Sequence, residues 1–228
     1  MAVINDPTVA ANIARIGNVA YTPMHVTSGP FPYGAGGIYK ISMVSATIGA
    51  ALGANSELFQ FRYVTGAARV ALIHGISVSA AMNVAASAAA LLSLRATIAR
   101  AWTVAGSSGT RANLSGNNNK LRTSATTSEV NDIGMATTAA LVAGTKNLDA
   151  QDFGAVSYSA LTGAITVATQ GVLVPKTNIF GEFSGGGLAS PLILANQEGF
   201  VIRSGIINPA GMTWALNVDV AWSEVDEF

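Results

Sequence analysis

Cysteine is absent from the 228-residue sequence, which excludes disulfide bonds, thiol nucleophiles and cysteine-based zinc sites. Charge is also scarce, because Asp, Glu, Lys and Arg make up 11% of the chain where about 25% is usual. Twelve cationic and twelve anionic side chains give a formal net charge of zero, a balance that favours association. The cations are scattered from Arg15 to Arg203 without a cluster, so we expect no nucleic-acid partner.

We expect neither a secretion signal nor a membrane segment in this sequence. The first residues carry no Lys or Arg and reach an acid at Asp6, unlike the basic start of a secretion signal. The longest uncharged stretch that leans apolar, residues 76–94, approaches spanning length, but four serines and an asparagine interrupt it. Because this stretch is also rich in alanine, which is nearly neutral in transfer, we expect no membrane partner.

Groups that carry catalysis are few. His74 falls on the apolar face of a predicted strand, where a hydrogen-bonded core histidine is favoured over a base. No Gly-x-Ser-x-Gly elbow and no Gly-Lys-Ser/Thr loop occurs. Asn147, Asp149 and Asp152 could offer oxygens to calcium, but such a site needs about six to eight ligands, so a solvated loop is favoured. The acidic cluster at residues 224–227 is expected to form a solvated tail. We therefore expect a non-enzyme with no cofactor and no metal.

Alternating side chains predict strands in what remains. Residues 212–222 place five large residues on one face, which predicts a half-buried strand. A second strand is predicted over residues 70–79 with the even-numbered residues on the apolar face, although Ile73 opposes the pattern. Residues 92–99 predict a third strand, and an alanine-rich helix over residues 84–92 is the alternative there.

Further short strands are separated by turn residues. Four more apolar runs are strand candidates: residues 57–65, 165–174, 191–195 and 200–207. Gly, Asn and Pro between the runs predict turns, and no alternation of strands with helices is visible. The sequence therefore predicts an all-β fold, a β-sandwich or jelly roll. Residues 107–128 are polar and rich in Gly and Asn, which predicts a long loop of a kind that usually contacts something.

The first 37 residues differ from the body of the chain and predict an extended N-terminal arm, followed by a β-sandwich domain over residues 38–228. Residues 7–16 predict one short helix, with Pro7 tolerated in its first turn. Two prolines and four glycines in residues 29–37 exclude long regular structure there. The arm either folds over the edge of its own sheet or lies across a neighbouring subunit. The candidate interface residues are Val9, Ile13, Ile16, Phe31 and Tyr33.

An ordered series of segments between about residues 38 and 225 carries a family resemblance. The segments are Glu57-Leu-Phe-Gln-Phe-Arg62, Gly116-Asn-Asn-Asn-Lys-Leu-Arg-Thr123, Asp132-Ile-Gly-Met-Ala136, Gly144-Thr-Lys-Asn-Leu-Asp-Ala-Gln151, Leu194-Ala-Asn-Gln-Glu-Gly-Phe-Val-Ile-Arg203 and the strand from Trp214 to Glu224. Together they resemble structural proteins encoded beside capsid genes in tailed bacteriophages. The resemblance implies a component of the virion and carries over no active site. By analogy of fold and setting, it also implies a decoration or cement protein, often a trimeric β-sandwich outside the head.

We therefore expect a non-enzymatic bacteriophage capsid decoration protein on the exterior of the virion. Its partners would be the major capsid protein and copies of itself, with a homotrimer as the expected oligomer. The alternative is a tail or head-fibre module that recognises a host surface glycan, which needs exposed aromatic residues. A major capsid subunit is disfavoured by the chain's length and by the lack of a long predicted helix, and an enzyme ranks last.

Overall fold

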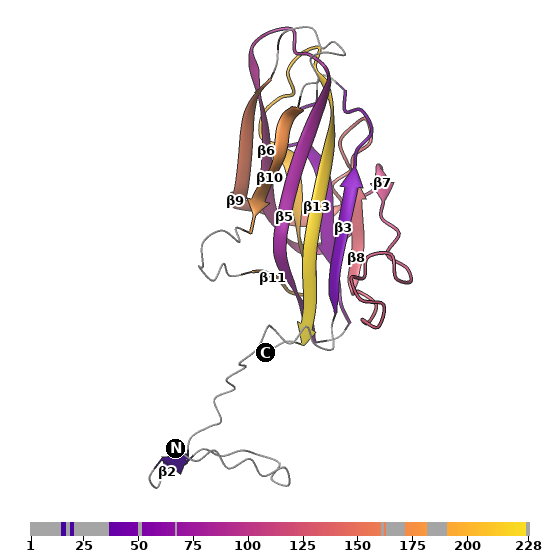
Figure 1. The fold of residues 1–228 in the computed structure, drawn as a ribbon, viewed down its shortest axis with the longest axis vertical. Helices are drawn as coiled ribbons and strands as arrows, with labels where there is room; N and C mark the ends of the chain where they lie inside the picture. The colour runs from indigo at the N-terminus through magenta and orange to yellow at the C-terminus, as the bar shows by residue number, and fades with distance from the viewer. Residues whose placement is uncertain are drawn as a thin grey trace. The chain divides into compact units, whose positions relative to one another are not determined.

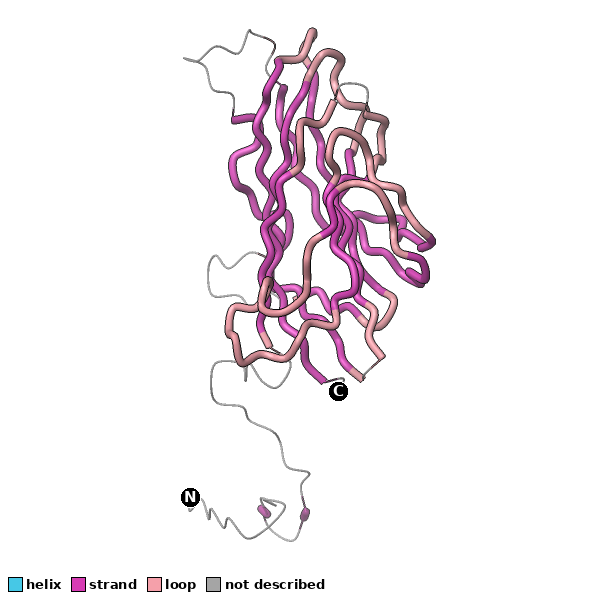
Figure 2. The backbone as a smooth tube through the Cα atoms, turned by 90° about the vertical axis from the view of Figure 1, so that its right-hand side faces the viewer, coloured by secondary structure: helices cyan, strands magenta, loops and turns pink. Residues whose placement is uncertain are grey.

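The computed structural model describes residues 15–16, 19–20, 37–49, 52–66, 68–160, 162, 172–181 and 191–226. The chain divides into two units, Met1–Tyr33 and Gly34–Phe228. In the first unit, the strands β1 (Arg15–Ile16) and β2 (Val19–Ala20) pair antiparallel. The second unit is a sandwich of two antiparallel sheets, with no helix among its described residues (Figures 1 and 2). The predicted all-β sandwich is confirmed.

The two sheets draw strands from the whole length of the second unit. The five-stranded sheet has the order β10-β5-β13-β3, and β11 also pairs with β5. The six-stranded sheet has the order β7-β8-β4-β12-β6-β9. The strands are β3 (Ile38–Val44), β4 (Glu57–Tyr63), β5 (Arg69–Val84), β6 (Ala90–Val104), β7 (Thr110–Arg111), β8 (Val130–Met135), β9 (Thr145–Ala160), β10 (Val172–Phe180), β11 (Leu192–Leu194), β12 (Glu198–Ser204) and β13 (Thr213–Asp226).

The strand pairs are nested along the sequence. β3 pairs with the last strand, β13, and inside this pair β4 pairs with β12, β5 with β10 and β6 with β9. The chain therefore folds like one long hairpin, rolled so that β3, β5, β10 and β13 form one sheet and β4, β6, β9 and β12 form the other. This arrangement is the eight-stranded jelly roll, to which β7, β8 and β11 are additions.

The middle of the five-stranded sheet confirms one predicted pattern and corrects another. The five large residues of β13, Trp214 to Trp222 in steps of two, are all 0% exposed. In β5, a bulge opposite β13 leaves His74 without a pairing partner and inverts the alternation of side chains. Ile73 therefore joins the core with Ile76 and Val78, while Leu72 lies outside the core cluster. The predicted sharing of one face by Leu72 and Ile76 is wrong, because the bulge separates them.

The alanine-rich segment forms a turn between two strands. β5 ends at Val84, residues 85–89 make the turn, and β6 begins at Ala90. The alternative helix over residues 84–92 is therefore wrong, and the predicted third strand is confirmed. Leu92 and Leu94 explain the outcome, since both are buried between the sheets. Burial of these side chains outweighs the helix preference of alanine, which is worth less than about 1 kcal/mol per residue.

Aromatic side chains join the two sheets in the core. Phe200 of β12 stacks on Phe61 of β4, with 5.0 Å between ring centroids. Phe61 in turn contacts the edge of Trp222 of β13 at 5.2 Å, and Trp222 stacks on Tyr39 of β3 at 5.4 Å. All four side chains are 0% exposed. Such stacked and edge-on pairs add to the free energy of burial, so they fix how one sheet packs on the other.

The predicted long loop is confirmed in its main part. Apart from β7 and isolated bridges, residues 107–128 contain no strand. Within the loop at residues 112–129, residues 119–121 pair with the start of β3. Lys40 N donates to Asn119 O at 2.9 Å, and Leu121 N donates to Ile38 O at 3.0 Å. These backbone bonds cover the start of β3 at the edge of the five-stranded sheet, so the loop contacts its own subunit and blocks pairing at that part of the edge.

The acidic C-terminal cluster is not a solvated tail at Glu224. β13 extends to Asp226, and Glu224 is 1% exposed. Its carboxylate accepts hydrogen bonds from Ser128 Oγ at 2.5 Å and from Glu129 N at 3.0 Å. Burial raises the pKa of Glu224, although these hydrogen bonds oppose the shift. The carboxylate thus anchors the end of the loop at residues 112–129, a role that requires partners far away in the sequence.

Candidate functional site

The predicted interface residues lie almost entirely outside the described residues. Val9, Ile13, Phe31 and Tyr33 are outside them, so the proposed arm contacts remain predictions. Ile16 is described in its backbone alone, where it pairs with Val19 in the β1–β2 ribbon. The helix predicted over residues 7–16 is therefore wrong at its last two residues, which pair as a strand. The rest of that helix lies outside the described residues.

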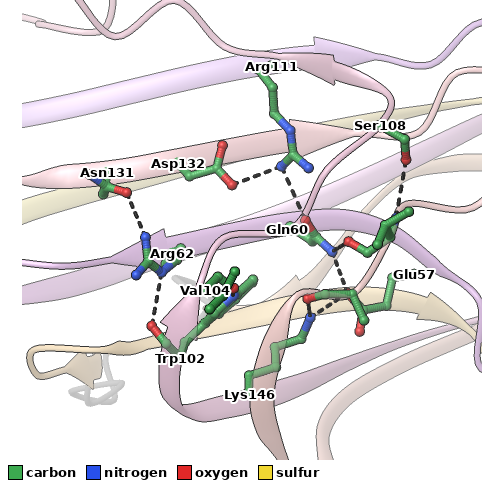
Figure 3. Close-up of polar contacts among 12 residues, drawn as sticks. Glu57, Gln60, Arg62, Trp102, Val104, Ser108, Arg111, Asn131, Asp132 and Lys146 are labelled. Atoms are coloured by element: carbon green, nitrogen blue, oxygen red, sulfur yellow. Dashed lines mark hydrogen bonds and ion pairs between the residues drawn. The ribbon is translucent and has the colours of Figure 1, made fainter.

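Charged side chains gather on the outer face of the six-stranded sheet. Gln60 and Arg62 of β4 point to this face (Figure 3). Phe59 and Phe61, which alternate with them along the strand, belong to the core. The end of β6 folds over the face after Ala101, whose φ is 49°. This brings the fully buried Trp102 against Ala99 and Val201, in a cluster apart from the main core. The polar side chains are therefore covered by the protein's own chain.

Lys146 and Glu57 form a buried ion pair at the centre of this network. Lys146 Nζ lies 2.8 Å from Glu57 Oε2, and the two side chains are 2% and 8% exposed. The ammonium also lies 4.3 Å from the centroid of the Trp102 ring and donates to the carbonyl of Ala143. Burial lowers the pKa of Lys146, while the hydrogen bond and charge of Glu57 oppose the shift. The net effect is that the amine of Lys146 is protonated less readily than that of a solvated lysine.

Gln60 links this ion pair to a second one. Its side-chain amide donates to Glu57 Oε2 at 2.6 Å and to Val142 O at 3.0 Å. Its carbonyl oxygen accepts from Arg111 Nη1 at 3.2 Å, and the same nitrogen donates to Asp132 Oδ2 at 2.9 Å. Burial raises the pKa of Asp132, while Arg111 and Arg62 oppose the shift. The chain of contacts thus runs across β4, β7, β8 and the start of β9 (Figure 3).

Arg62 closes the network at the other end of β4. Its Nε and Nη2 donate to the carbonyls of Trp102 and Thr103, both at 3.0 Å, and its Nη1 donates to Asn131 Oδ1 at 2.7 Å. Burial lowers the pKa of Arg62, although the nearby charge of Asp132 opposes the shift. The guanidinium thereby holds the crossing segment of β6 against the sheet, which is a structural role.

The residues considered for calcium lie in the middle of β9 rather than in a loop. Asp152 accepts hydrogen bonds from Thr97 Oγ1 at 2.5 Å and from Arg203 Nη2 at 2.9 Å. Burial raises its pKa, but these bonds and the charges of Arg203 and Arg95 outweigh burial, and the net shift is downward. Asp149 pairs with Arg100 at 2.9 Å. Both carboxylates thus have cationic partners, and the described residues contain no cluster of three or more metal-ligating side chains.

His74 is hydrogen-bonded as predicted, but it is only partly buried and lies outside the core, so the prediction of a core histidine is wrong in that respect. Its Nε2 lies 2.8 Å from Ser223 Oγ across the bulge, and burial lowers its pKa. A hollow of about 200 Å³ opens nearby on the outer face of the five-stranded sheet, with Lys176 and Asp219 in its lining. These two side chains form an ion pair of 2.6 Å. The hollow therefore already holds a neutralised charge pair, and it carries no aromatic residue in its lining.

At one end of the jelly roll, the three loops that the structure describes carry no charged residue. The three loops are residues 45–56, described at 45–49 and 52–56, residues 85–89 and residues 205–212 (top of Figure 1). Backbone hydrogen bonds join them, from Ser87 N to Ala210 O at 3.0 Å and from Asn208 N to Leu52 O at 2.8 Å. No Asp, Glu, Lys or Arg occurs in any of the three loops. We call these loops the uncharged end.

Large apolar side chains are exposed at the uncharged end and at the strand residues beside it. Ile207 is 66% exposed, Val84 51%, Leu91 50% and Ile206 36%. Exposed apolar residues gathered at one place mark interaction surfaces more often than singly scattered ones. Exposed apolar residues such as Val104, Leu121 and Val142 also lie elsewhere, so the combination of exposed apolar side chains with three uncharged loops makes the uncharged end the candidate interface of the second unit. Sequence reasoning did not single out these residues, although the lack of charge in all three loops was a readable signal.

Comparison with known protein families, with characterised proteins and with solved structures gives no match. Among the described residues, no helix has the length and apolar character needed to cross a membrane.

Proposed function

We propose that the protein is a non-enzymatic decoration, or cement, protein of a tailed-bacteriophage capsid. It binds the shell of the major capsid protein on the exterior of the virion and stabilises it. The observation that carries the proposal is the uncharged end, with Ile207, Val84 and Leu91 at least half exposed. Burying a charge against a partner is costly unless the charge is paired, whereas an uncharged apolar surface is buried favourably.

The fold and the sequence support this choice of partner. Jelly rolls recur in viral capsid proteins and lectins, so the architecture suits both a capsid protein and a glycan-binding module. Fold alone does not decide between them. The ordered segments that resemble phage structural proteins favour the capsid. A shell repeats each contact many times, so a modest interface at the uncharged end suffices for stable decoration.

The glycan-binding alternative gains no support from the tryptophans. Trp102, Trp214 and Trp222 are all 0% exposed, so none forms a platform on which a sugar ring could stack. We therefore keep the capsid as the proposed partner. Copies of the chain associate as a homotrimer in this proposal, and the arm at residues 1–37 contributes the contact between neighbours through Phe31 and Tyr33.

Reconstitution on heads tests the proposal. Heads of the encoding phage that lack this protein are mixed with the purified chain, and the bound copies per head and the resistance of the heads to heating are measured. Ile207→Lys and Val84→Lys place charge on the uncharged end and should reduce occupancy at least tenfold, which corresponds to about 1.4 kcal/mol. Val104→Lys is the matched control, because Val104 is 56% exposed but lies outside the three loops.

The outcomes separate the two proposed contacts. If the Ile207→Lys and Val84→Lys variants bound heads as well as the wild-type chain does, the uncharged end would be refuted as the interface. Deleting residues 1–37 removes the proposed contact between neighbouring copies, so it should lower the cooperativity of decoration. The contact between the uncharged end and the shell should remain intact. Absence of wild-type binding to heads, with binding to host surface glycans instead, would overturn the capsid proposal itself.

A further inference from the structure

An amine, an amide and a carboxylate lie side by side beneath the end of β6. The Lys146 ammonium and the Gln60 amide nitrogen both donate to one oxygen, Glu57 Oε2, at 2.8 and 2.6 Å. All three side chains are withdrawn from water, with Gln60 0% exposed and the side chains of Lys146 and Glu57 at 2% and 8%. The amine and the amide are therefore neighbours across a single oxygen atom (Figure 3).

We propose that Lys146 and Gln60 form an intramolecular isopeptide bond, with Glu57 as the proton carrier. Glu57 first accepts a proton from the Lys146 ammonium, and the neutral amine attacks Gln60 Cδ. The negative charge of the tetrahedral adduct resides on Oε1. Glu57 then protonates Nε2, the Cδ–Nε2 bond breaks and ammonia leaves, and Glu57 takes up the second proton from Nζ. The products are the Nζ–Cδ amide, free ammonia and protonated Glu57, so atoms and charge balance without an oxidant or co-reactant.

The surrounding groups fit the three roles. Burial lowers the pKa of Lys146, which brings the nucleophilic neutral amine within reach. A carboxylate that contacts both the entering and the leaving nitrogen is placed to move a proton from one to the other. Arg111 Nη1 donates to Gln60 Oε1 at 3.2 Å, so a fixed cation lies where the oxyanion develops. Asp132 holds that guanidinium in place at 2.9 Å.

The site also excludes competing water. Trp102 covers the Lys146 ammonium at 4.3 Å and is itself fully buried. The backbone at Gly106 approaches the amide so closely that an added Cβ would lie 2.7 Å from Gln60 Nε2. The second hydrogen of the amide is held by Val142 O at 3.0 Å, which fixes the plane of the amide. A buried, oriented amide next to an amine reacts with the amine rather than with solvent.

The bond goes beyond the proposed capsid role. β9 is an edge strand that pairs only with β6 in its sheet, whereas β4 lies inside the sheet between β8 and β12. A covalent link from the start of β9 to β4 would tie the edge of the sheet to its interior. It would also close a long loop of chain, which restricts the unfolded state as other cross-links do. The chain has no cysteine for this purpose.

Mass spectrometry of the full chain tests the bond directly. The intact wild-type protein should be lighter than its sequence mass by one ammonia. Trypsin should leave the bond after Lys146 uncut and should yield the Gln60 peptide joined to the Lys146 peptide. A full-mass wild-type chain that trypsin cleaves after Lys146 would overturn the proposal, and ammonia loss that maps to an asparagine instead would do the same.

Variants test the individual roles. Glu57→Gln keeps the shape of the side chain but removes the proton carrier, so it should restore the full mass. Lys146→Met should do so as well, while Lys176→Met, which removes an ion-paired lysine elsewhere, should keep the ammonia loss. Persistence of the cross-link in Glu57→Gln would refute the assigned role of Glu57. Near-ultraviolet circular dichroism of the buried tryptophans checks that each variant is folded, and the wild-type peptide map decides the existence of the bond regardless of how the variants behave.

Discussion

Truncating Phe200 should be among the most damaging single changes to this fold. Phe200 is 0% exposed in β12, stacks on Phe61 and Phe59 with centroid distances of 5.0 and 5.9 Å, and meets the edge of Phe153 at 6.3 Å. β12 is hydrogen-bonded on both sides, to β4 and β6, so its backbone cannot move inward to fill a void. Phe200→Ala should therefore leave most of the side-chain volume empty.

The expected cost follows from these contacts. A buried Phe→Ala change lowers the free energy of unfolding by about 3–5 kcal/mol, and Phe200 should fall in the upper half because aromatic pairs add about 0.5–1.5 kcal/mol. Phe153→Ala is the matched control. Phe153 is only partly buried, at the edge of the same cluster, so the same truncation should cost about 1–2 kcal/mol.

Equilibrium unfolding in urea, followed by tryptophan fluorescence, measures both variants. Trp214 and Trp222 are fully buried and Trp222 touches Phe61, so their emission reports loss of the core. If the slope of the free energy of unfolding against urea concentration is the same in wild type and variants, the shift in the unfolding midpoint reflects a change in stability alone. If Phe200→Ala cost no more than Phe153→Ala, then β12 would not hold the centre of the core, and the packing described here would be refuted.

Two further changes test the buried carboxylate and the close packing of β12. Burial raises the pKa of Glu224 above its ordinary value of 4.5. The contribution of Glu224 to the free energy of unfolding should therefore be fully present at a pH below 4.5 and should be lost as the pH rises through the raised pKa. The stability of the wild type relative to Glu224→Gln should therefore fall with rising pH in that window, and a constant difference in urea titrations across pH would contradict this. A Cβ at Gly199 would collide with the carbonyl oxygen of Phe61, so Gly199→Ala should cost about 1–3 kcal/mol. Gly66→Ala, with open space around the added methyl group, should be close to neutral in the same unfolding assay, and equal effects of the two changes would argue against the crowding at Gly199.

The alternation of side chains along the sequence predicted those strands in which one face is apolar and the other is small or polar. β13 was predictable because five large residues alternate with small or polar ones and every large residue is buried. β9 was missed because it is an edge strand with charged and small residues on both faces, such as Asp149 and Asp152, so its sequence resembles a loop. The bulge at His74 was also out of reach, because a bulge is defined by pairing with a partner strand far along the chain.

The candidate sites were harder to predict than the strands. Glu57 and Lys146 are 89 residues apart in the sequence, and Gln60 meets Arg111 across 51 residues. No local spacing reports such contacts, because they arise only when β4, β7 and β9 are brought together. The uncharged end arises in the same way, from three loops that no short motif connects. Turn residues at Gly53 to Asn55 and at Asn208-Pro209 were readable in the sequence, whereas residues 85–89 looked like part of an alanine-rich run. The convergence of the three loops depends on the jelly-roll order of the strands.

The chain is formally neutral, but many of its charged residues gather on one face of the second unit. Arg62, Arg95, Arg100, Arg111, Lys146 and Arg203, half of the cationic residues, all have polar or acidic partners on the outer face of the six-stranded sheet. The charge there is used inside the subunit to hold the end of β6 and the start of β9 in place. A partner that approached this face would have to desolvate or break these ion pairs, and the free energy lost in doing so would exceed the free energy gained from the new contacts. At the uncharged end a partner has no paired charge to displace in the three loops, and it covers exposed apolar side chains such as Ile207. Association is therefore directed to that end by the internal pairing of the charges as much as by the apolar residues themselves.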